Sequence, residues 1–593
     1  MNLALAWWPT PGNFEAASPL PGLPDPAPVI ERLRGGDFAR EVERLADEVM
    51  AHRFPMLGFA VETGPEIHWR RDYRRGIETG ADYFRKVPYL DVNQVGDHKI
   101  IWELSRHQHF VLLAQAARLT GRAEYGDEVW RQWESWVAAN PFQHGINWCS
   151  ALEVAFRALS WTWTYHLLGG SWSSEQRRRF LVELERHGRH LEYNLSYYFS
   201  PNTHLLGEAV ALHALGHLFP MFPRSARWRE LGHQVVTTEL ERQVRPDGAH
   251  FEQSTYYHVY ALDFFLLHYL LAGRPATYRP VLTKMGEYLD AVLGPARSIP
   301  LIGDDDGGRL FHPYGVHVEY GRATMSLAGL MLDRADWVGD ESTLAPLAVW
   351  WLGETVPGAS RRAAGSRLFP ASGTVTLEHG DQFIVFDAGG FGAYSAGHSH
   401  SDSLSVYVLQ GGEELLIDPG TCEYVGETRN RFRGSAAHNT IRVDGLDQAE
   451  PRGSFGWEGR PEVAILRHEF LPERDVVEAV CRYQGFTHRR RLTYEKPSQL
   501  TIVDDIEGPP GEHVVEQFWH LGAPLTPLAP AEFRIGAQAV LRLAADASIT
   551  TEDGARSLAY GRQEPAAVLV ARRTGPLPLR LTTVLVFGGS SAG

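Results

Sequence analysis

The chain has 593 residues, 44% of them hydrophobic and 22% charged, which is the composition of a folded globular protein with two or three domains. Its net charge of −15 argues against a nucleic-acid-binding protein, because such a protein needs a basic face, and an acidic partner would have to meet a local basic patch. Three cysteines do not describe a disulfide framework, and no segment is long enough to span a membrane.

The N-terminal segment MNLALAWWPTPG lacks the basic start and apolar run of a secretory signal, so we expect a cytoplasmic protein. A chain trimmed of its signal would instead be periplasmic or secreted. From about residue 30 to 350, apolar residues recur three and four positions apart, which predicts helices in sequential pairs. Short connections between them indicate a helical toroid or solenoid, and the lack of a fixed repeat length argues against a tetratricopeptide array.

From about residue 366 onward the apolar period falls to two, in short runs separated by Gly, Asp and Pro. This pattern predicts a large antiparallel β-sandwich. We therefore expect an α+β multidomain chain, with a helical domain over residues 1–365 and a β-sandwich domain over residues 366–593.

Polar side chains gather in the stretch AGHSHSDSLS. His398, His400 and Asp402 are spaced two apart, so an extended chain points all three to one side. Asp418 ends the next predicted strand, and His438 follows in a loop. Such nitrogen and carboxylate ligands suit zinc or a similar divalent ion, but the same residues on a polar strand face are equally explained by solvation or hydrogen bonding.

Two further groups lie where helices are predicted to begin. Asn202 and His204 open one helix, where Asn202 is either a cap or, with the helix amides, a binder of carboxylates. Tyr256 and Tyr257 precede another apolar helical run, and they pack in the core or, with the polar Glu252 nearby, belong to a site.

Other charged residues recur on helical faces, where ion pairs between neighbouring helices compete with substrate contact as an explanation. These residues are Arg106, Gln108, Asn147, Glu153 and Arg157. The run Asp304 to Asp306 in IPLIGDDDGGRL is interpreted as a turn.

Taken together, the segments NTHLLGEA, DGAHFEQSTYYHVYALDFF, GHSHSDSLSVYV, LLIDPGTCEY and AAHNTIRVDGLDQ resemble the heparinase II/III family of polysaccharide lyases over about residues 90–450. The resemblance implies an incomplete α/α toroid followed by an antiparallel β-sandwich, with the site between them. It also implies β-elimination on uronic-acid polymers, with a glycosaminoglycan such as heparan sulfate, heparosan or hyaluronan as substrate. The alternatives are a lyase for alginate, bacterial exopolysaccharide or oligouronides, and a non-lytic enzyme of acidic surface-polysaccharide metabolism on the same scaffold.

The resemblance also implies catalytic roles. Asn202, assisted by His204, neutralises the uronate carboxylate. Tyr257, with Tyr256 as the alternative, serves as base and acid, and for base work its pKa of about 10 must be lowered by a nearby histidine or arginine. His398 completes the site from the sandwich domain.

Finally, the resemblance implies a structural divalent metal ion, usually zinc, held by His400, Asp418 and His438. The arginines of TRNRFRG either supply a basic patch or form a solvated loop. The expected partner is an acidic polysaccharide or oligosaccharide, with no nucleic acid or membrane partner, and a homodimer is compatible with a toroid. The expected substrate contacts are Arg106, Gln108, Asn147, Glu153, Arg157, Glu252 and Arg433.

Overall fold

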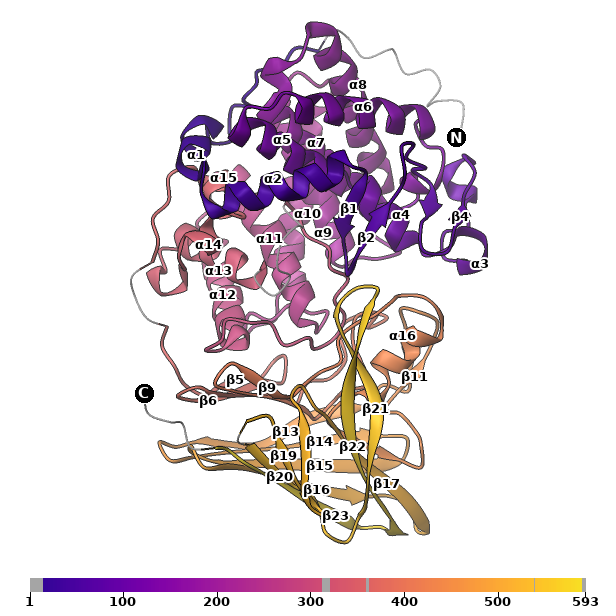
Figure 1. Cartoon of the computed structure of the whole chain (residues 1–593), viewed down its shortest axis with the longest axis vertical. Helices are drawn as coiled ribbons and strands as arrows, with labels where there is room; N and C mark the ends of the chain where they lie inside the picture. Colours follow the sequence, from indigo (N-terminus) through magenta and orange to yellow (C-terminus); the bar gives the residue numbers. More distant parts are fainter. Residues whose placement is uncertain (1–13, 312–319, 359–361, 538, 589–593) are drawn as a thin grey trace.

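The structure is a computed structural model that describes residues 14–311, 320–358, 362–537 and 539–588. A helical region is followed by a region of antiparallel sheets, and the two lie one above the other in Figure 1. This arrangement confirms the predicted fold class. The last helix of the helical region ends at Leu352, and the first strand of the large sheets begins at Arg367. The domain division at residue 365 stays a prediction. The N-terminal segment considered above lies outside the described residues.

Four helix pairs form the arc of a toroid. Inner helices pack side by side in chain order, and each is followed by an outer partner. The inner helices are α5 (Gln108–Thr120), α7 (Ala151–Leu168), α9 (Thr203–Leu218) and α11 (Thr255–Leu271), and the outer helices are α6 (Glu124–Ala139), α8 (Ser174–Asn194), α10 (Ser225–Gln243) and α12 (Arg279–Leu293).

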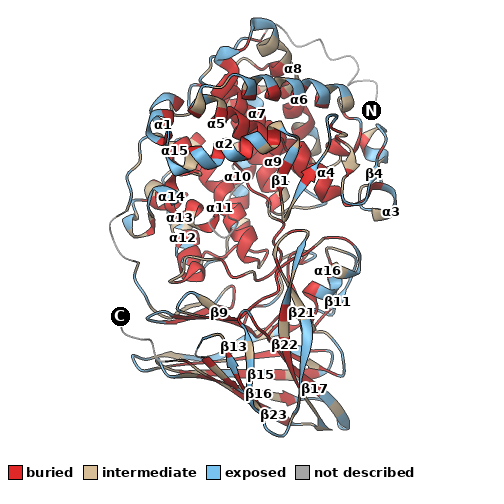
Figure 2. Cartoon of the chain, in the orientation of Figure 1, coloured by how far each residue is buried: buried red, intermediate tan, exposed pale blue. Residues whose placement is uncertain are grey.

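Burial explains this division into inner and outer helices. Every residue of α7 is buried, as expected for a helix with apolar residues on all sides, and its few charged side chains are buried too, whereas α8 is buried along one face only. Figure 2 shows the same contrast, with α7 largely red and α6 and α8 edged in pale blue. Ser173 and Gln176 form a capping box at the start of α8, so the outer helix has a defined first turn.

Shorter elements complete the helical region. They are α1 (Pro26–Leu33), α2 (Asp37–Met50), β1 (Arg53–Met56), β2 (Phe59–Glu62), β3 (Arg71–Asp72), β4 (Ile77–Glu78), α3 (Val92–Val95), α4 (His98–Ser105), α13 (Tyr320–Met331), α14 (Glu341–Leu344) and α15 (Ala348–Leu352). No described helix has the length and apolar character needed to cross a bilayer.

Three antiparallel sheets make up the second region, and their inner faces share one apolar core. The five-stranded sheet runs β5 (Arg367–Phe369), β6 (Thr374–His379), β7 (Gln382–Asp387), β8 (Ser405–Gln410) and β9 (Glu413–Leu416). The eight-stranded sheet runs β13 (Glu462–Phe470), β14 (Arg474–Tyr483), β15 (Phe486–Glu495), β16 (Gln499–Glu507), β23 (Leu579–Val586), β20 (Ala539–Arg542), β19 (Glu532–Ile535) and β18 (Leu525–Ala529). The third runs β10 (Ile441–Val443), β17 (Glu512–His520), β22 (Arg562–Pro576) and β21 (Ser548–Ala559), and α16 (Gly426–Arg433), β11 (Glu450–Pro451) and β12 (Trp457–Glu458) lie between strands in the chain.

Two contacts fix the sheets against the helices. Strand β7 faces the helical region, and a Cβ atom added to Gly294 would meet the ring of Phe383 at 2.8 Å. The long β21–β22 hairpin rises to the helical region in Figure 1. There Gly58 donates to the Tyr560 carbonyl (2.8 Å), and the Tyr560 hydroxyl donates to Asp97 (2.9 Å). The loops between these contacts therefore face one another across the junction of the two regions.

Candidate active site

The N-terminus of α9 supplies the first group. Asn202 is the N-cap residue, and its Oδ1 accepts a hydrogen bond from the His204 backbone N–H (3.1 Å). The cap leaves the Nδ2 hydrogens as donors, and the side chain also contacts Glu252. Burial, followed by the nearby charge of His398, lowers the pKa of His204 to about 4, so that imidazole is neutral at pH 7.

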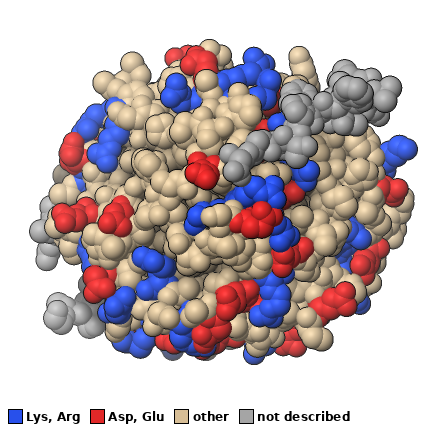
Figure 3. All heavy atoms as spheres, turned by 90° about the horizontal axis from the view of Figure 1, so that it is seen from above, with Lys and Arg blue, Asp and Glu red and all other residues tan. Residues whose placement is uncertain are grey.

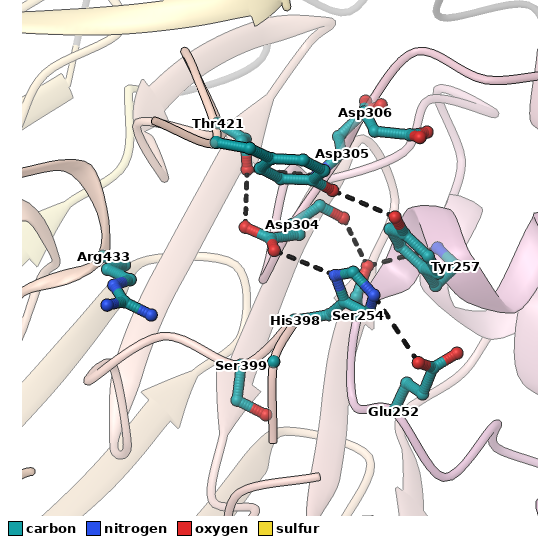
Figure 4. A network of polar contacts seen from close by, with 12 residues as sticks. Glu252, Ser254, Tyr257, Asp304, Asp305, Asp306, His398, Ser399, Thr421 and Arg433 are labelled. Atoms are coloured by element: carbon teal, nitrogen blue, oxygen red, sulfur yellow. Dashed lines mark hydrogen bonds and ion pairs between the residues drawn. The ribbon is translucent and has the colours of Figure 1, made fainter. Parts of the chain in front are cut away.

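The N-terminus of α11 decides between the two tyrosines. Ser254 caps this helix by accepting from the Tyr257 N–H (3.1 Å). Consecutive residues on a helix point about 100° apart, and here the Tyr256 hydroxyl donates to the Gly308 carbonyl (2.9 Å). Tyr257 instead stacks on the ring of His398, with centroids 3.8 Å apart, as Figure 4 shows. Tyr257 is therefore the tyrosine that meets the sheet region.

The electrostatic setting of Tyr257 differs from the expectation. Burial raises its pKa well above the ordinary value, the carboxylates of Asp306 and Asp304 raise it further, and the hydrogen bond with Tyr424 (Oη to Oη 3.0 Å) opposes them only in part. The expected lowering of this pKa by a histidine or arginine is therefore wrong for this state of the site, because burial and, after it, the nearby carboxylates raise the pKa. Tyr257 holds its proton here.

His398 reaches the site from the sheet region. Its Nδ1 lies 2.9 Å from Asp304 Oδ2, and its Nε2 lies 3.6 Å from Glu252 Oε1. Burial alone would lower the pKa of His398, but the bond with Asp304 and the charge of Glu252 outweigh burial and raise it. Asp304 thus fixes the ring so that Nε2 faces the helical wall.

Asp304 is the residue that the sequence interpretation missed. Its carboxylate is fully buried and contacts His398, His400 (2.9 Å), Thr421 (3.2 Å) and both terminal nitrogens of Arg429. Burial would raise the pKa of Asp304, but Arg429 and the two histidines hold it well below its usual range. The segment interpreted as a turn therefore carries a carboxylate that contacts both the catalytic candidate His398 and the candidate metal ligand His400.

One sequence signal points to the unusual role of this segment. Gly303 has a φ of 71°, and a Cβ atom there would lie 2.9 Å from the His398 carbonyl. Only glycine lets the chain pass so close to His398 in this conformation. The Asp304 N–H then donates to that same carbonyl (2.9 Å).

The predicted metal ligands come together as a candidate metal-binding triad. One ligand atom from each of His400, Asp418 and His438 lies within 4.8 Å of the others, and all three residues are buried. His438 Nδ1 lies 2.8 Å from Asp418 Oδ2, while His400 Nδ1 and His438 Nε2 have no hydrogen-bond partner among the described residues. Orphaned buried nitrogens beside a carboxylate fit a bound cation, and the bond from His400 Nε2 to Asp304 is the outer contact that orients a metal-binding histidine.

The seven expected substrate contacts fall into different surroundings. Glu252 lines the pocket described below and lies beside Thr203 and His398. Arg106 instead binds Glu153 through two hydrogen bonds (2.6 and 2.8 Å) and covers the ring of Phe156, and both charged groups are buried. This pair has the geometry of a structural ion pair.

The other four side chains are also enclosed by protein. Arg157 donates to the Asn147 carbonyl (3.0 Å) and is held between tryptophan rings, and burial lowers its pKa to about 9. Asn147 donates to the Trp69 carbonyl (2.9 Å), and Gln108 donates to the Arg309 carbonyl. Arg433 covers the ring of Trp457 and donates to the Ser454 carbonyl, and in Figure 4 it lies apart from the network. Substrate contact by these residues stays a prediction without support from this geometry.

A small pocket marks where substrate would enter. Residues 199–202 of the helical region and 393–398 of the sheet region line it, together with Glu252. Its volume of about 40 Å³ is far below the roughly 300–1,000 Å³ of ligand pockets. Arg242 bonds both the Tyr394 hydroxyl and the Pro201 carbonyl, so one side chain joins the two walls. A larger cavity of about 950 Å³ lies in the sheet region beside Phe518, away from these groups.

Two models of one protein family match consecutive parts of this chain. The model of the heparinase II/III N-terminus matches residues 33–309, and that of the heparinase II/III-like C-terminal domain matches residues 361–582. A heparin-sulfate lyase of Bacteroides stercoris is 24% identical over 519 residues, which cover 80% of this chain and 69% of that protein. One from Pedobacter heparinus is 29% identical over 277 residues, which cover 44% of this chain and 38% of that protein.

Solved structures agree on the fold. The crystal structure of heparinase III aligns over 100% of this chain and 90% of its own, with a TM-score of 0.70 and 17% identity. The chondroitin AC lyase of Streptomyces coelicolor A3 aligns over 96% and 81%, with a TM-score of 0.55 and 11% identity. Because the two family models together span most of the sequence, the chain belongs to the heparinase II/III family of polysaccharide lyases.

Proposed function

We propose that this chain cleaves a glycosaminoglycan that contains uronic acid, of the heparan-sulfate type, by β-elimination. The observation that carries the proposal is that Asn202 and His398, from two regions, line one pocket, and that Tyr257 stacks on the ring of His398. An amide donor, a phenol and an imidazole are the groups that elimination from a uronate requires. Three relatives named heparin-sulfate lyases support the substrate class.

The first step is neutralisation of the substrate carboxylate. The C5–H of a uronate is a weak acid, and negative charge builds on the neighbouring carboxylate as that proton leaves. The Nδ2 hydrogens of Asn202 and the positive end of α9 stabilise this charge. Because His204 is neutral, it can assist Asn202 only through a hydrogen bond and not through a positive charge.

The second step removes the C5 proton and expels O4. In its neutral form His398 accepts the proton at Nε2, since Nδ1 donates to Asp304. The raised pKa of His398 makes Nε2 a stronger base, but it also lowers the fraction of the ring that is neutral at a given pH. The C5 electrons form the C4–C5 double bond, the C4–O4 bond breaks, and the Tyr257 hydroxyl donates its proton to O4. The raised pKa of Tyr257 suits this acid role because the proton is present before the reaction begins.

The stacking of the two rings favours one sugar epimer. Because the Tyr257 and His398 rings lie face to face at 3.8 Å, their polar atoms approach the sugar from one side. Elimination from one side is possible where C5–H and O4 share a face, as they do in glucuronate but not in iduronate. We therefore assign glucuronate-containing chains such as heparosan and low-sulfated heparan sulfate as the preferred substrates.

Exposed aromatic rings at the pocket support a sugar polymer as ligand. Tyr198 and Phe199 are 99% and 73% exposed and directly precede the pocket wall, and Tyr394 is 53% exposed on the opposite wall. Sugar rings have apolar C–H faces that pack on such rings. The helical end of the molecule, in contrast, mixes acidic and basic side chains (Figure 3), so no single-sign surface there would attract a polyanion.

The divalent ion proposed at His400, Asp418 and His438 is zinc in a structural role. These ligands would tie the His400 loop to the end of β9 and to the segment before β10, and so place His398. Elimination consumes no water, so this role requires no metal-activated water.

A substrate panel tests the proposal. Purified protein is given heparosan, heparan sulfate, heparin, hyaluronan, chondroitin and alginate, and the ultraviolet absorbance of unsaturated uronate is followed. We expect the highest rate on heparosan or heparan sulfate and a lower rate on iduronate-rich heparin. A lyase signal on alginate alone would overturn the substrate assignment, and no signal on any polymer with folded, metal-loaded protein would overturn the proposal.

A further inference from the structure

A second histidine cluster lies inside the helical region. His213 on α9, His233 on α10 and His268 on α11 place one ring nitrogen each within 4.8 Å of the others. His213 and His268 are buried and His233 is partly exposed. None of these residues belongs to the site described above.

The spacing of the nitrogens matches a metal site. His233 Nδ1 and His268 Nε2 are 3.4 Å apart. In a tetrahedral zinc site with Zn–N bonds of about 2.0–2.1 Å, ligand nitrogens are also about 3.4 Å apart. The ring of His213 completes the group, with its centroid 4.5 Å from that of His268 and 6.0 Å from that of His233.

The hydrogen bonds leave one buried lone pair without a partner. His213 Nδ1 lies 2.9 Å from the Arg229 carbonyl, so it carries the hydrogen and Nε2 carries the lone pair. That buried Nε2 has no hydrogen-bond partner among the described residues. A backbone carbonyl that orients the ring from behind is the usual outer contact of a metal-binding histidine.

Ordinary packing explains only part of this cluster. A hydrogen bond between His233 and His268 accounts for the 3.4 Å contact but leaves His213 Nε2 buried and unpaired, which costs about 1–3 kcal/mol. In the described part of the chain, none of the three rings pairs with a carboxylate that would explain its burial.

We propose that His213, His233 and His268 bind a divalent transition-metal ion, with Zn²⁺ as the best match to three imidazole ligands. A fourth position would take water, which can enter from the partly exposed side at His233. The ion would join three consecutive helices that pack on one another.

The position of the ion along two of these helices gives it a role. His213 lies eleven residues past Asn202, and His268 lies eleven residues past Tyr257. At 1.5 Å per residue, each is about 16 Å from the proposed catalytic group at the start of the same helix. An ion at this depth would fix α9 against α11, and with them the relative positions of Asn202 and Tyr257.

Metal counting tests the site directly. The chain is stripped with a chelator, reloaded with Zn²⁺ and analysed for metal content. In a His400→Ala background, which removes the sheet-region site, we expect about one Zn²⁺ per chain. Adding His233→Gln abolishes this binding, whereas adding His217→Gln, one turn further along α9, leaves it unchanged. His233 is partly exposed, so the Gln variant keeps the fold, which circular dichroism verifies.

Two outcomes would overturn the inference. One is that His400→Ala alone binds no Zn²⁺. The other is that His233→Gln in that background still binds it. Loading with Co²⁺ gives a second readout, because four-coordinate Co²⁺ absorbs strongly in visible light, and this absorption is lost in His233→Gln. Metal binding is measured without a polysaccharide substrate. A chain that binds Zn²⁺ at this site but cleaves no polymer would therefore support this inference and contradict the proposed function.

Discussion

The two histidine clusters of this protein contain buried rings whose pKa values shift in opposite directions. In the sheet region, burial would lower the pKa of His398 and of His438, but Asp304 and Asp418 raise both values. In the helical region, burial lowers the pKa of His213 to about 4 and that of His268 to about 2. For His398 and His438 a carboxylate partner outweighs burial, whereas His213 is bonded to a backbone carbonyl that does not.

This difference separates two uses of histidine. In the sheet region, His398 and His438 each have a carboxylate partner that orients the ring, which suits a base fixed toward a substrate and a ligand fixed toward a metal ion. In the helical region, burial lowers the pKa of His213 and of His268, which reduces competition between protons and a metal ion for their lone pairs. The following changes test the two regions separately.

The largest effect is expected from the two groups that transfer protons. Tyr257→Phe and His398→Ala should each lower kcat by about 10²- to 10⁴-fold, because one proton donor or acceptor is lost from the transition state. Rates on heparosan and metal content are measured together. Since neither side chain is a metal ligand, Zn²⁺ content should be unchanged, and parallel loss of metal and turnover in His398→Ala would contradict the separation of roles.

Asp304→Asn tests the anion that sets the sheet-region cluster apart. The change leaves the buried Arg429 guanidinium without its countercharge, which should cost about 3–5 kcal/mol of unfolding free energy. It also releases His398 Nδ1 from its charged partner, so kcat should fall with little change in KM. Thr421→Val, which removes only one neutral contact of Asp304, is the matched control and should keep most of the activity. An Asn variant with full kcat would exclude an orienting role.

His400→Ala should remove the sheet-region ion and the stability that the ion provides. At free Zn²⁺ about 100-fold above Kd, bound metal contributes about 3 kcal/mol. The melting temperature is measured with and without chelator. The parent chain should lose stability from both metal sites when chelator is added, whereas His400→Ala should lose only the part that the helical site provides. Equal chelator sensitivity of His400→Ala and the parent would contradict a metal at this triad.

Acid should destabilise the helical region through histidines that have no carboxylate partner. Burial lowers the pKa of His109 and of His190 to about 3, while the unfolded chain titrates near 6.5. The unfolded state therefore binds more protons between pH 6.5 and about 3, and stability falls as the pH is lowered. The loss is about 2 kcal/mol for each residue at pH 5. His190→Gln should flatten this slope, as measured by denaturant unfolding at several pH values.

The smallest effect is expected at the exposed aromatic wall. Tyr198→Ala removes a ring that is 99% exposed, so stability should not change. A stacking contribution of about 0.5–1.5 kcal/mol corresponds to a KM increase of roughly 2- to 10-fold. Tyr198→Phe keeps the ring face and should keep KM. An unchanged KM in Tyr198→Ala would place the sugar chain elsewhere.

Local patterns in the sequence predict the division of the fold. Helix α7 is mostly apolar and fully buried, whereas β15 alternates between buried and more exposed positions, so the change in period follows the change in burial. Asn202, Tyr257 and His398 are likewise found in local motifs that open helices or follow a glycine.

Long-range contacts explain what the sequence does not reveal. Asp304 meets His398 and Arg429, which are 94 and 125 positions further along the chain, so its burial depends on how the two regions join. The raised pKa of Tyr257 has the same origin. Arg106 and Glu153, 47 positions apart, satisfy one another inside the helical arc, which no local pattern distinguishes from a substrate contact.

The elimination mechanism itself can be tested in one measurement. Heparosan is cleaved in water enriched in ¹⁸O, and the products are analysed by mass spectrometry. Elimination takes no oxygen from water, so we predict products that carry a 4,5-unsaturated uronate and no ¹⁸O introduced by cleavage. Saturated products that contain one ¹⁸O at each cut would show hydrolysis and contradict the account.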